Sequence, residues 1–113
     1  MKEELLHFIW NYKLLKSKEL FSVKGVPIKI HHPGDLNKDA GPDFFNSKIQ
    51  IDGVTLAGNV EIHVNSSDWL KHGHENDPAY NNLILHAVYK YDKPIEQNTK
   101  HNVEILELKN TIN

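Results

Sequence analysis

The sequence contains no cysteine and no arginine. Without cysteine there is no disulfide framework, no thiolate metal site and no cysteine nucleophile. All 13 basic residues are lysine, so the chain lacks the planar guanidinium that recognises phosphate or guanine through two parallel hydrogen bonds. No apolar run approaches the ~18 residues of a membrane span, and the N-terminus lacks the apolar segment of a signal peptide. We therefore expect a cytoplasmic protein that does not enter a membrane.

The composition is that of an ordinary folded domain. At 113 residues the chain is long enough for one hydrophobic core, and we expect a single domain over residues 1–113. Hydrophobic residues make up 39% and charged residues 25%, which is typical of a globular protein. The formal charge of −2 gives no overall attraction to nucleic acid or anionic lipid. Histidine is the one enriched residue type, with eight copies.

Hydrophobic periodicity predicts the order of the secondary-structure elements. Leu5, Phe8, Ile9, Tyr12 and Leu15 recur at helical spacing. Alternating apolar residues and turn signals indicate the other elements. The expected elements are a helix at 2–16, strands at 25–31, 44–51 and 55–64, short helical turns at 66–69 and 78–82, and strands at 83–91 and 102–108. This order, a helix, three strands, a short helical connection and two more strands, predicts an α+β fold with a mixed sheet.

The stretch from residue 41 to residue 64 holds the residues that suggest chemistry. Asp52-Gly53 is a strong hairpin turn signal between two strands. In the second strand Glu61 and His63 are two residues apart and therefore share one face. Asp43 enters the first strand, so pairing of the hairpin brings it toward the same end of the sheet. An aspartate, a glutamate and a histidine converging there predict a divalent-metal hydrolytic site.

Several sequence motifs resemble those of an uncharacterised bacterial family, the domain of unknown function DUF2851. The resemblance covers nearly the whole chain and corresponds to the N-terminal part of the usually longer family members, so the chain is either a short relative or part of a longer protein. The motifs are Asp39-Ala-Gly-Pro-Asp-Phe-Phe-Asn46, Gly58-Asn-Val-Glu-Ile-His63, Ser67-Asp-Trp69, His72-Gly-His74 and Tyr80-Asn-Asn-Leu-Ile-Leu-His86.

The order of elements, with Pro42-Asp43 before one strand and Glu61-Ile62-His63 on the next, is also similar to the PD-(D/E)XK nuclease superfamily. That resemblance implies a restriction-endonuclease-like core and a Mg²⁺ or Mn²⁺ ion bound by Asp43, Glu61 and the Ile62 carbonyl. It also implies an acid on the first helix, Glu4 or Glu3. His63 stands where the superfamily usually has lysine, so an imidazole would assist the attacking water here.

On this hypothesis the chain is a metal-dependent phosphodiester hydrolase whose partner is DNA or another nucleic acid. The segment after the hairpin would line the substrate cleft, through Trp69, Lys71, His72 and His74. Trp69 could stack on a nucleobase or could instead cover the core.

Two alternatives remain open at this point. His63, His72 and His74 could bind Zn²⁺ in a catalytic zinc site, because three imidazoles and an open position suit that ion. His86 lies in an apolar strand and reads as a hydrogen-bonded core histidine. The other alternative is a non-catalytic remnant or partner-binding domain, which the missing arginine and His63 favour. The wide apolar stripe of the first helix, which includes Trp10, also predicts a homodimer contact.

Overall fold

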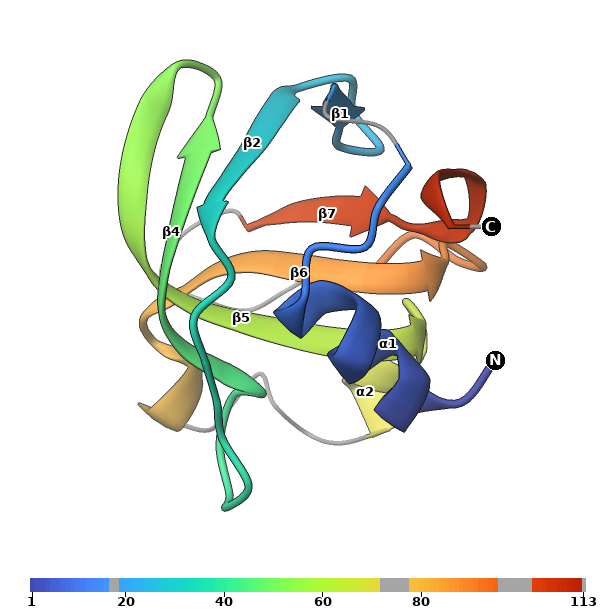
Figure 1. The fold of residues 1–113 in the computed structure, drawn as a ribbon. Helices are drawn as coiled ribbons and strands as arrows, with labels where there is room; N and C mark the ends of the chain where they lie inside the picture. The colour runs from blue at the N-terminus through green and yellow to red at the C-terminus, as the bar shows by residue number, and fades with distance from the viewer. Residues whose placement is uncertain (17–18, 72–77, 96–102, 113) are drawn as a thin grey trace.

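The computed structural model describes residues 1–16, 19–71, 78–95 and 103–112. These residues form a seven-stranded sheet that curves until it is nearly barrel-shaped (Figure 1). The elements are α1 (Glu3–Asn11), β1 (Leu20–Phe21), β2 (Pro27–His32), β3 (Asp35–Leu36), β4 (Phe44–Ile51), β5 (Val54–Asn65), α2 (Asp68–Lys71), η2 (Pro78–Tyr80), β6 (Leu83–Lys90), β7 (Glu104–Glu107) and η3 (Lys109–Thr111).

The sheet is mixed, as predicted. Its strand order is β1-β2-β4-β5-β6-β7, and β3 pairs with β4 off this path. The strands from β1 to β5 pair antiparallel, whereas β5, β6 and β7 run parallel to one another. The predicted hairpin is confirmed: β4 and β5 join at Asp52 and Gly53, whose φ angles of 51° and 81° are the positive values of a tight primed turn.

Helix α1 is shorter than the predicted helix at 2–16. It ends at Asn11, and Lys13 adopts a left-handed φ of 51°. This conformation closes the helix, with the amide of Leu14 donating to the carbonyl of Ile9 at 2.9 Å. Leu15 still packs against the core from the following segment. The apolar periodicity of the sequence therefore extends past Asn11, where the helix ends.

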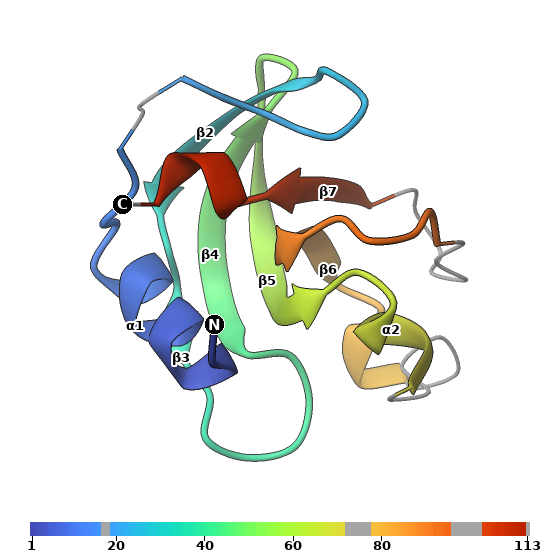
Figure 2. The same cartoon turned by 90° about the vertical axis from the view of Figure 1, so that its right-hand side faces the viewer.

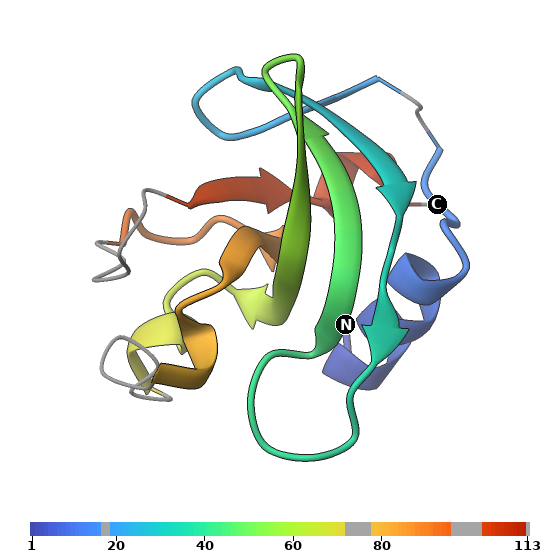
Figure 3. The same cartoon turned by 90° about the vertical axis from the view of Figure 1, so that its left-hand side faces the viewer.

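Both faces of the inner half of β5 are buried. On one face Val60 and Ile62 pack with Leu6 and Trp10 of α1 in the main core. On the other side lie α2 and a second apolar cluster formed by Trp69, Tyr80, Leu83 and Val103. Figures 2 and 3, which view the molecule from opposite sides, both place α1 and α2 on opposite sides of β5. The polar residues Glu61 and His63 are consequently buried, where the sequence pattern alone allowed a solvated face.

The connection from β5 to β6 departs from the expected nuclease core. Within the described residues it contains only the four-residue α2 and the three-residue η2, and the predicted helix at 78–82 is reduced to η2. Strands β1 and β3 were not predicted, because two-residue strands carry no periodicity. The α+β mixed sheet is thus shown, while a restriction-endonuclease-like core is not.

Candidate metal centre

The loop that leads into β4 is fixed by Asn37. Its side-chain amide donates to the carbonyls of Asp39, Ala40 and Pro42 at 3.2, 3.0 and 2.9 Å. Its backbone amide donates to the carbonyl of Asp43 at 2.8 Å. These four hydrogen bonds hold the loop in one shape, so Asp43 enters β4 from a defined position.

The beginning of the same loop is attached to α1. The carbonyl of Pro33 accepts hydrogen bonds from Trp10 Nε1 at 3.0 Å and from Ser47 Oγ at 2.8 Å. Gly34 follows with φ +95°, and a Cβ atom there would lie 2.3 Å from Ser47 Oγ. Glycine is therefore required by both the backbone conformation and the close approach. Helix α1 and the loop that carries Asp43 are joined into one unit.

A β-bulge then sets the direction of the side chains at the start of β4. Phe44 pairs with Val60 and Ser47 pairs with Gly58, so β4 has one extra residue between these two pairs. Asn46 takes up that extra residue with a positive φ of 58°. Because an extra residue reverses the alternation of side chains along a strand, the bulge determines which face Asp43 presents.

Asp43 and Glu61 meet at this end of the sheet. The register of Phe44 with Val60, continued by one residue, places Asp43 opposite Glu61, and the two carboxyl side chains are hydrogen-bonded to each other. Asp43 Oδ2 also accepts a hydrogen bond of 2.7 Å from the amide of Ile62. Glu61 is only 2% exposed and also hydrogen-bonds with the Tyr80 side chain. The structure thus brings together the two carboxylates that the sequence singled out.

Helix α1 adds two further groups, Glu3 and His7. His7 Nε2 lies 3.4 Å from Asp43 Oδ1 and 3.7 Å from Glu3 Oε1. The ring of His7 packs edge-on against Phe44, with centroids 6.0 Å apart. Of the two helix acids considered from the sequence, Glu3 is the one in contact with this cluster, whereas Glu4 is exposed.

The electrostatics of the cluster separate the two carboxyl groups. Burial raises the pKa of Glu61, and the hydrogen bond and negative charge of Asp43 raise it further. Burial also opposes ionisation of Asp43, but its contacts with His7, Glu61 and the Ile62 amide together lower the pKa of that carboxyl. The contact with Asp43 raises the pKa of His7 in spite of partial burial. At neutral pH the metal-free pair therefore holds a proton on Glu61 and a negative charge on Asp43.

His63 lies in a different cluster from Asp43 and Glu61. Its Nδ1 is 2.9 Å from His86 Nε2, and both rings are fully buried. Trp69 covers His86 with a ring-centroid distance of 5.4 Å and is itself 0% exposed. His63 thus shares the face of Glu61, as predicted, but hydrogen-bonds to a second imidazole, and Trp69 is a core residue in this structure.

The structure describes little of Lys71, His72 and His74, the other residues predicted to line the substrate cleft. Lys71 ends α2, and its side chain lies outside the described part of the structure. His72 and His74 also lie outside the described residues, so a zinc site made by His63, His72 and His74 stays a prediction.

Sequence reasoning missed His7 and the contact of Tyr80 with Glu61. The spacing Glu3-x-x-x-His7 was the available signal for His7, because residues four apart on a helix lie on one face. For Tyr80 there was no comparable signal, since its position depends on the path of the connection that precedes β6.

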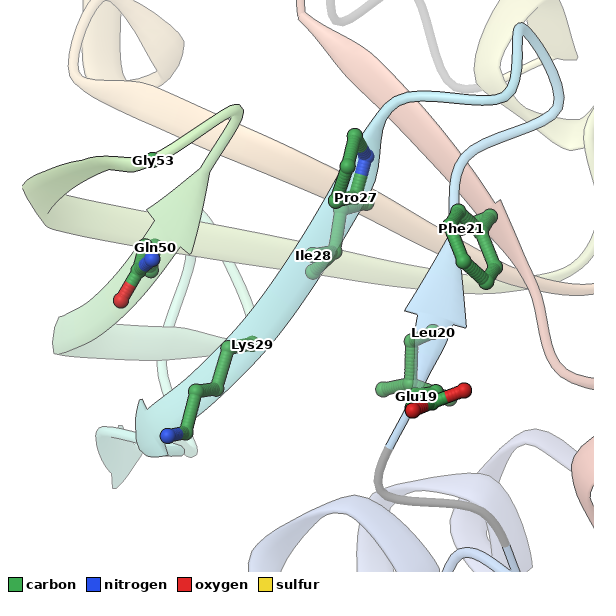
Figure 4. A pocket seen from close by; sticks show the side chains of 8 residues that line it. All are labelled: Glu19, Leu20, Phe21, Pro27, Ile28, Lys29, Gln50 and Gly53. Atoms are coloured by element: carbon green, nitrogen blue, oxygen red, sulfur yellow. The ribbon is translucent and has the colours of Figure 1, made fainter.

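Two surface grooves differ in their relation to this cluster. One, of about 300 Å³, opens beside His7 and is lined by Glu4, His7, Phe8, Asn11, Tyr12 and Leu36. Figure 4 shows the other, of about 390 Å³, which is lined by Glu19, Leu20, Phe21, Pro27, Ile28, Lys29, Gln50 and Gly53. None of the predicted site residues lines the groove of Figure 4, whereas His7 of the candidate centre lines the first groove.

Fold and site together define a small α+β fold with a mixed sheet, in which the buried Glu61 and the partly buried Asp43 form a carboxyl pair beside a helix. The model of one family, described as "Protein of unknown function (DUF2851)", matches residues 3–113. The chain therefore belongs to the DUF2851 family, as its sequence motifs indicated. No curated protein and no solved structure matches it. Among the described residues, no helix combines the length and apolar character needed to cross a membrane.

Proposed function

We propose that the chain is a divalent-metal-dependent phosphodiester hydrolase in which Asp43 and Glu61 bind the ion. The observation that carries the proposal is the direct contact of the buried Glu61 carboxyl group with the partly buried carboxyl group of Asp43. Two carboxyl groups that are hydrogen-bonded to each other and largely removed from water share one proton, because it is costly for both to carry charge there. A divalent cation can replace that proton and allow both groups to ionise, which is the behaviour of a metal site.

The surrounding residues support this interpretation. The Ile62 amide holds one oxygen of Asp43 at 2.7 Å and leaves the other directed toward His7. The carbonyl of Ile62 points to the same edge of β5 as its amide, since the two groups of one strand residue face one way. A cation held here would neutralise charge on a phosphodiester and lower the pKa of a bound water. Glu3 adds a third carboxylate beside the pair.

The charge of the site determines how a nucleic acid would bind. Glu3, Glu4 and Asp43 are acidic groups around His7, and their charges raise its pKa. An anionic phosphate is therefore repelled until a cation is in place. We expect binding of DNA or another nucleic acid to depend strictly on prior binding of the metal.

The alternative of a non-catalytic, partner-binding domain is favoured by the position of His63. In this structure the imidazole predicted to assist the attacking water is hydrogen-bonded to His86 inside the protein. The hydrolase therefore requires water activation by the metal and the carboxyl groups alone. This requirement makes the measurement of turnover decisive between the two functions.

The test combines metal binding with DNA cleavage. Calorimetric titration with Mn²⁺ would compare the unchanged protein with Asp43→Asn and Glu61→Gln, and Asp39→Asn would serve as the control on the same exposed loop. We expect Mn²⁺ binding in the unchanged protein and the control, its loss in the two site variants, and Mn²⁺-dependent cleavage of single- or double-stranded DNA with the same pattern. Binding without cleavage would favour the partner-binding domain, and no binding would overturn the metal site.

A further inference from the structure

Helix α1 presents a nitrogen donor to the candidate centre, and this donor changes which ion the centre should select. We propose that His7, Glu3 and Asp43 form a three-donor metal site that prefers transition-metal ions such as Zn²⁺, Co²⁺ and Mn²⁺ over Mg²⁺. The inference deepens the proposed function and rests on it through Asp43, which belongs to both the carboxyl pair and this triad.

The distances within the triad fit a single ion. One ligand atom from each residue lies within 4.8 Å of the other two, and the two measured contacts of His7 Nε2 are 3.4 and 3.7 Å. Ligands about 2.1 Å from a tetrahedral metal lie about 3.4 Å from one another. The two contacts of His7 are therefore close to the separation that a bound ion would impose, and the Glu3 and Asp43 oxygens lie within 4.8 Å of each other.

The scaffold holds the donors in place. Glu3 and His7 are four residues apart in α1 and so lie on one face of the helix. Leu6 and Trp10, which anchor that helix in the core, are at most 1% exposed. Asp43 is fixed from the opposite side by the Ile62 amide. Two donors on a packed helix and a third on a restrained loop give the preorganisation that metal sites need.

The Nε2 atom of His7 also lacks a well-formed hydrogen bond. Its Nε2 is closed to solvent and has no partner at hydrogen-bond geometry among the described residues, although two carboxylate oxygens lie at ion-pair distance. A buried ring nitrogen without a hydrogen bond is costly. A metal ion between the nitrogen and the two oxygens would satisfy all three donors at once.

The donor set determines the class of ion. Mg²⁺ prefers six oxygen ligands, whereas imidazole nitrogen suits Zn²⁺ and the other first-row transition metals. Three protein ligands leave a coordination position for water or substrate. A groove of about 300 Å³, which His7 helps to line, lies beside the triad.

The chain offers matched controls for each helix donor. His7→Gln is compared with His31→Gln, because His31 is an exposed histidine on β2. Glu3→Gln is compared with Asp39→Asn, the same carboxylate-to-amide change at an exposed loop residue outside the triad. Calorimetric titrations with Zn²⁺, Co²⁺ and Mg²⁺ alone measure affinity, and nitrogen-15 NMR of the imidazoles identifies the coordinating ring. Thermal melting monitored by circular dichroism verifies that each variant is folded.

We expect Zn²⁺ to bind more tightly than Mg²⁺ and to shift the Nε2 resonance of His7. His7→Gln and Glu3→Gln should each weaken Zn²⁺ binding by more than about 100-fold, since loss of a group that only orients a ligand already costs about 10- to 100-fold, while both controls bind as the unchanged protein does. His7→Gln should bring the Zn²⁺ and Mg²⁺ affinities close together.

The outcomes separate this inference from the proposed function. Metal binding that is lost in Asp43→Asn but unchanged in His7→Gln and Glu3→Gln would overturn the triad and leave the carboxyl pair intact. Zn²⁺ binding through His7 without any cleavage of DNA would support the triad and overturn the hydrolase. If His7→Gln does not fold, Glu3→Gln decides the matter, because Glu3 lies at the end of the helix and outside the core.

Discussion

Two polar clusters lie along β5 and differ in their charge and in the residues that cover them. Glu61 and His63 are neighbours on one face of β5, yet Glu61 joins Asp43 and the α1 residues, and His63 joins His86 and Trp69. The first cluster concentrates negative charge and borders a groove beside α1. The second is sealed beneath an indole ring. Strand alternation therefore assigns residues to a face, but the elements packed on that face decide their chemistry.

The difference has a simple physical origin. The Glu61 cluster lies where the register of β4 with β5 ends, and the loop that precedes β4 meets α1 there. Both Glu61 and His63 pair with β6, but His63 lies one pleat further along, beyond the last pairing of β4 with β5, where Trp69 of α2 covers the imidazole pair. Asp43 remains 17% exposed in the first cluster, whereas both rings of the imidazole pair are at most 1% exposed and hydrogen-bond within the protein.

The largest effect should follow from removing the cover of the second cluster. Trp69→Ala should lower the free energy of unfolding by about 3–5 kcal/mol, because it deletes a fully buried aromatic side chain. Urea unfolding measures the change, and Trp69→Phe, which keeps a ring against His86 and Tyr80, should cost much less. A loss of DNA binding with stability unchanged would instead restore Trp69 to the substrate cleft predicted from the sequence.

A smaller loss should follow from breaking the imidazole pair. His63→Leu and His86→Leu should each lower the free energy of unfolding by about 1–3 kcal/mol, since each leaves the partner nitrogen without its 2.9 Å contact. The double variant should lose less than the sum of the two. Zn²⁺ affinity should stay unchanged in both single variants. Weaker Zn²⁺ binding in His63→Leu would contradict the separation of the clusters and support the histidine zinc site.

Much of the fold followed from local signals in the sequence. The hairpin turn at Asp52 and Gly53, the alternation of Val60 and Ile62 with Glu61, and the mixed sheet were all predictable, because they depend on turn chemistry and periodicity. The end of α1 was not, since apolar residues continue past Asn11 and only tertiary contacts decide where the helix stops. Single domain, cytoplasmic location and homodimer formation stay predictions.

The candidate site was predicted in part for the same reason. The contact of Asp43 with Glu61 followed from hairpin register, although it also needs a bulge at Asn46 that the sequence did not reveal. The separation of His63 from the carboxyl groups could not be foreseen, because it depends on the pairing of β5 with a strand more than twenty residues away. Long-range pairing is the information that local patterns lack.

The smallest expected effect is the pH dependence of stability that Glu61 causes, because its buried carboxyl group is held neutral. A folded-state pKa raised above its usual value of 4.5 means that this group's contribution to stability is fully present below pH 4.5 and is lost as pH rises. Glu61→Gln removes the titration and keeps the shape. In metal-free protein with a chelator present, the variant should become more stable than the unchanged protein by about 1–2 kcal/mol at pH 8 and by much less at pH 5.

Urea unfolding at the two pH values measures this gain, and Glu4→Gln controls for the loss of an exposed carboxylate. A variant that gains stability while it loses Mn²⁺ binding would show that Glu61 is retained at a cost to the fold, which is the pattern expected of a functional residue. A variant less stable at both pH values would show that the carboxyl group serves the fold itself. The Glu61 cluster would then be structural, like the imidazole pair two residues further along the strand.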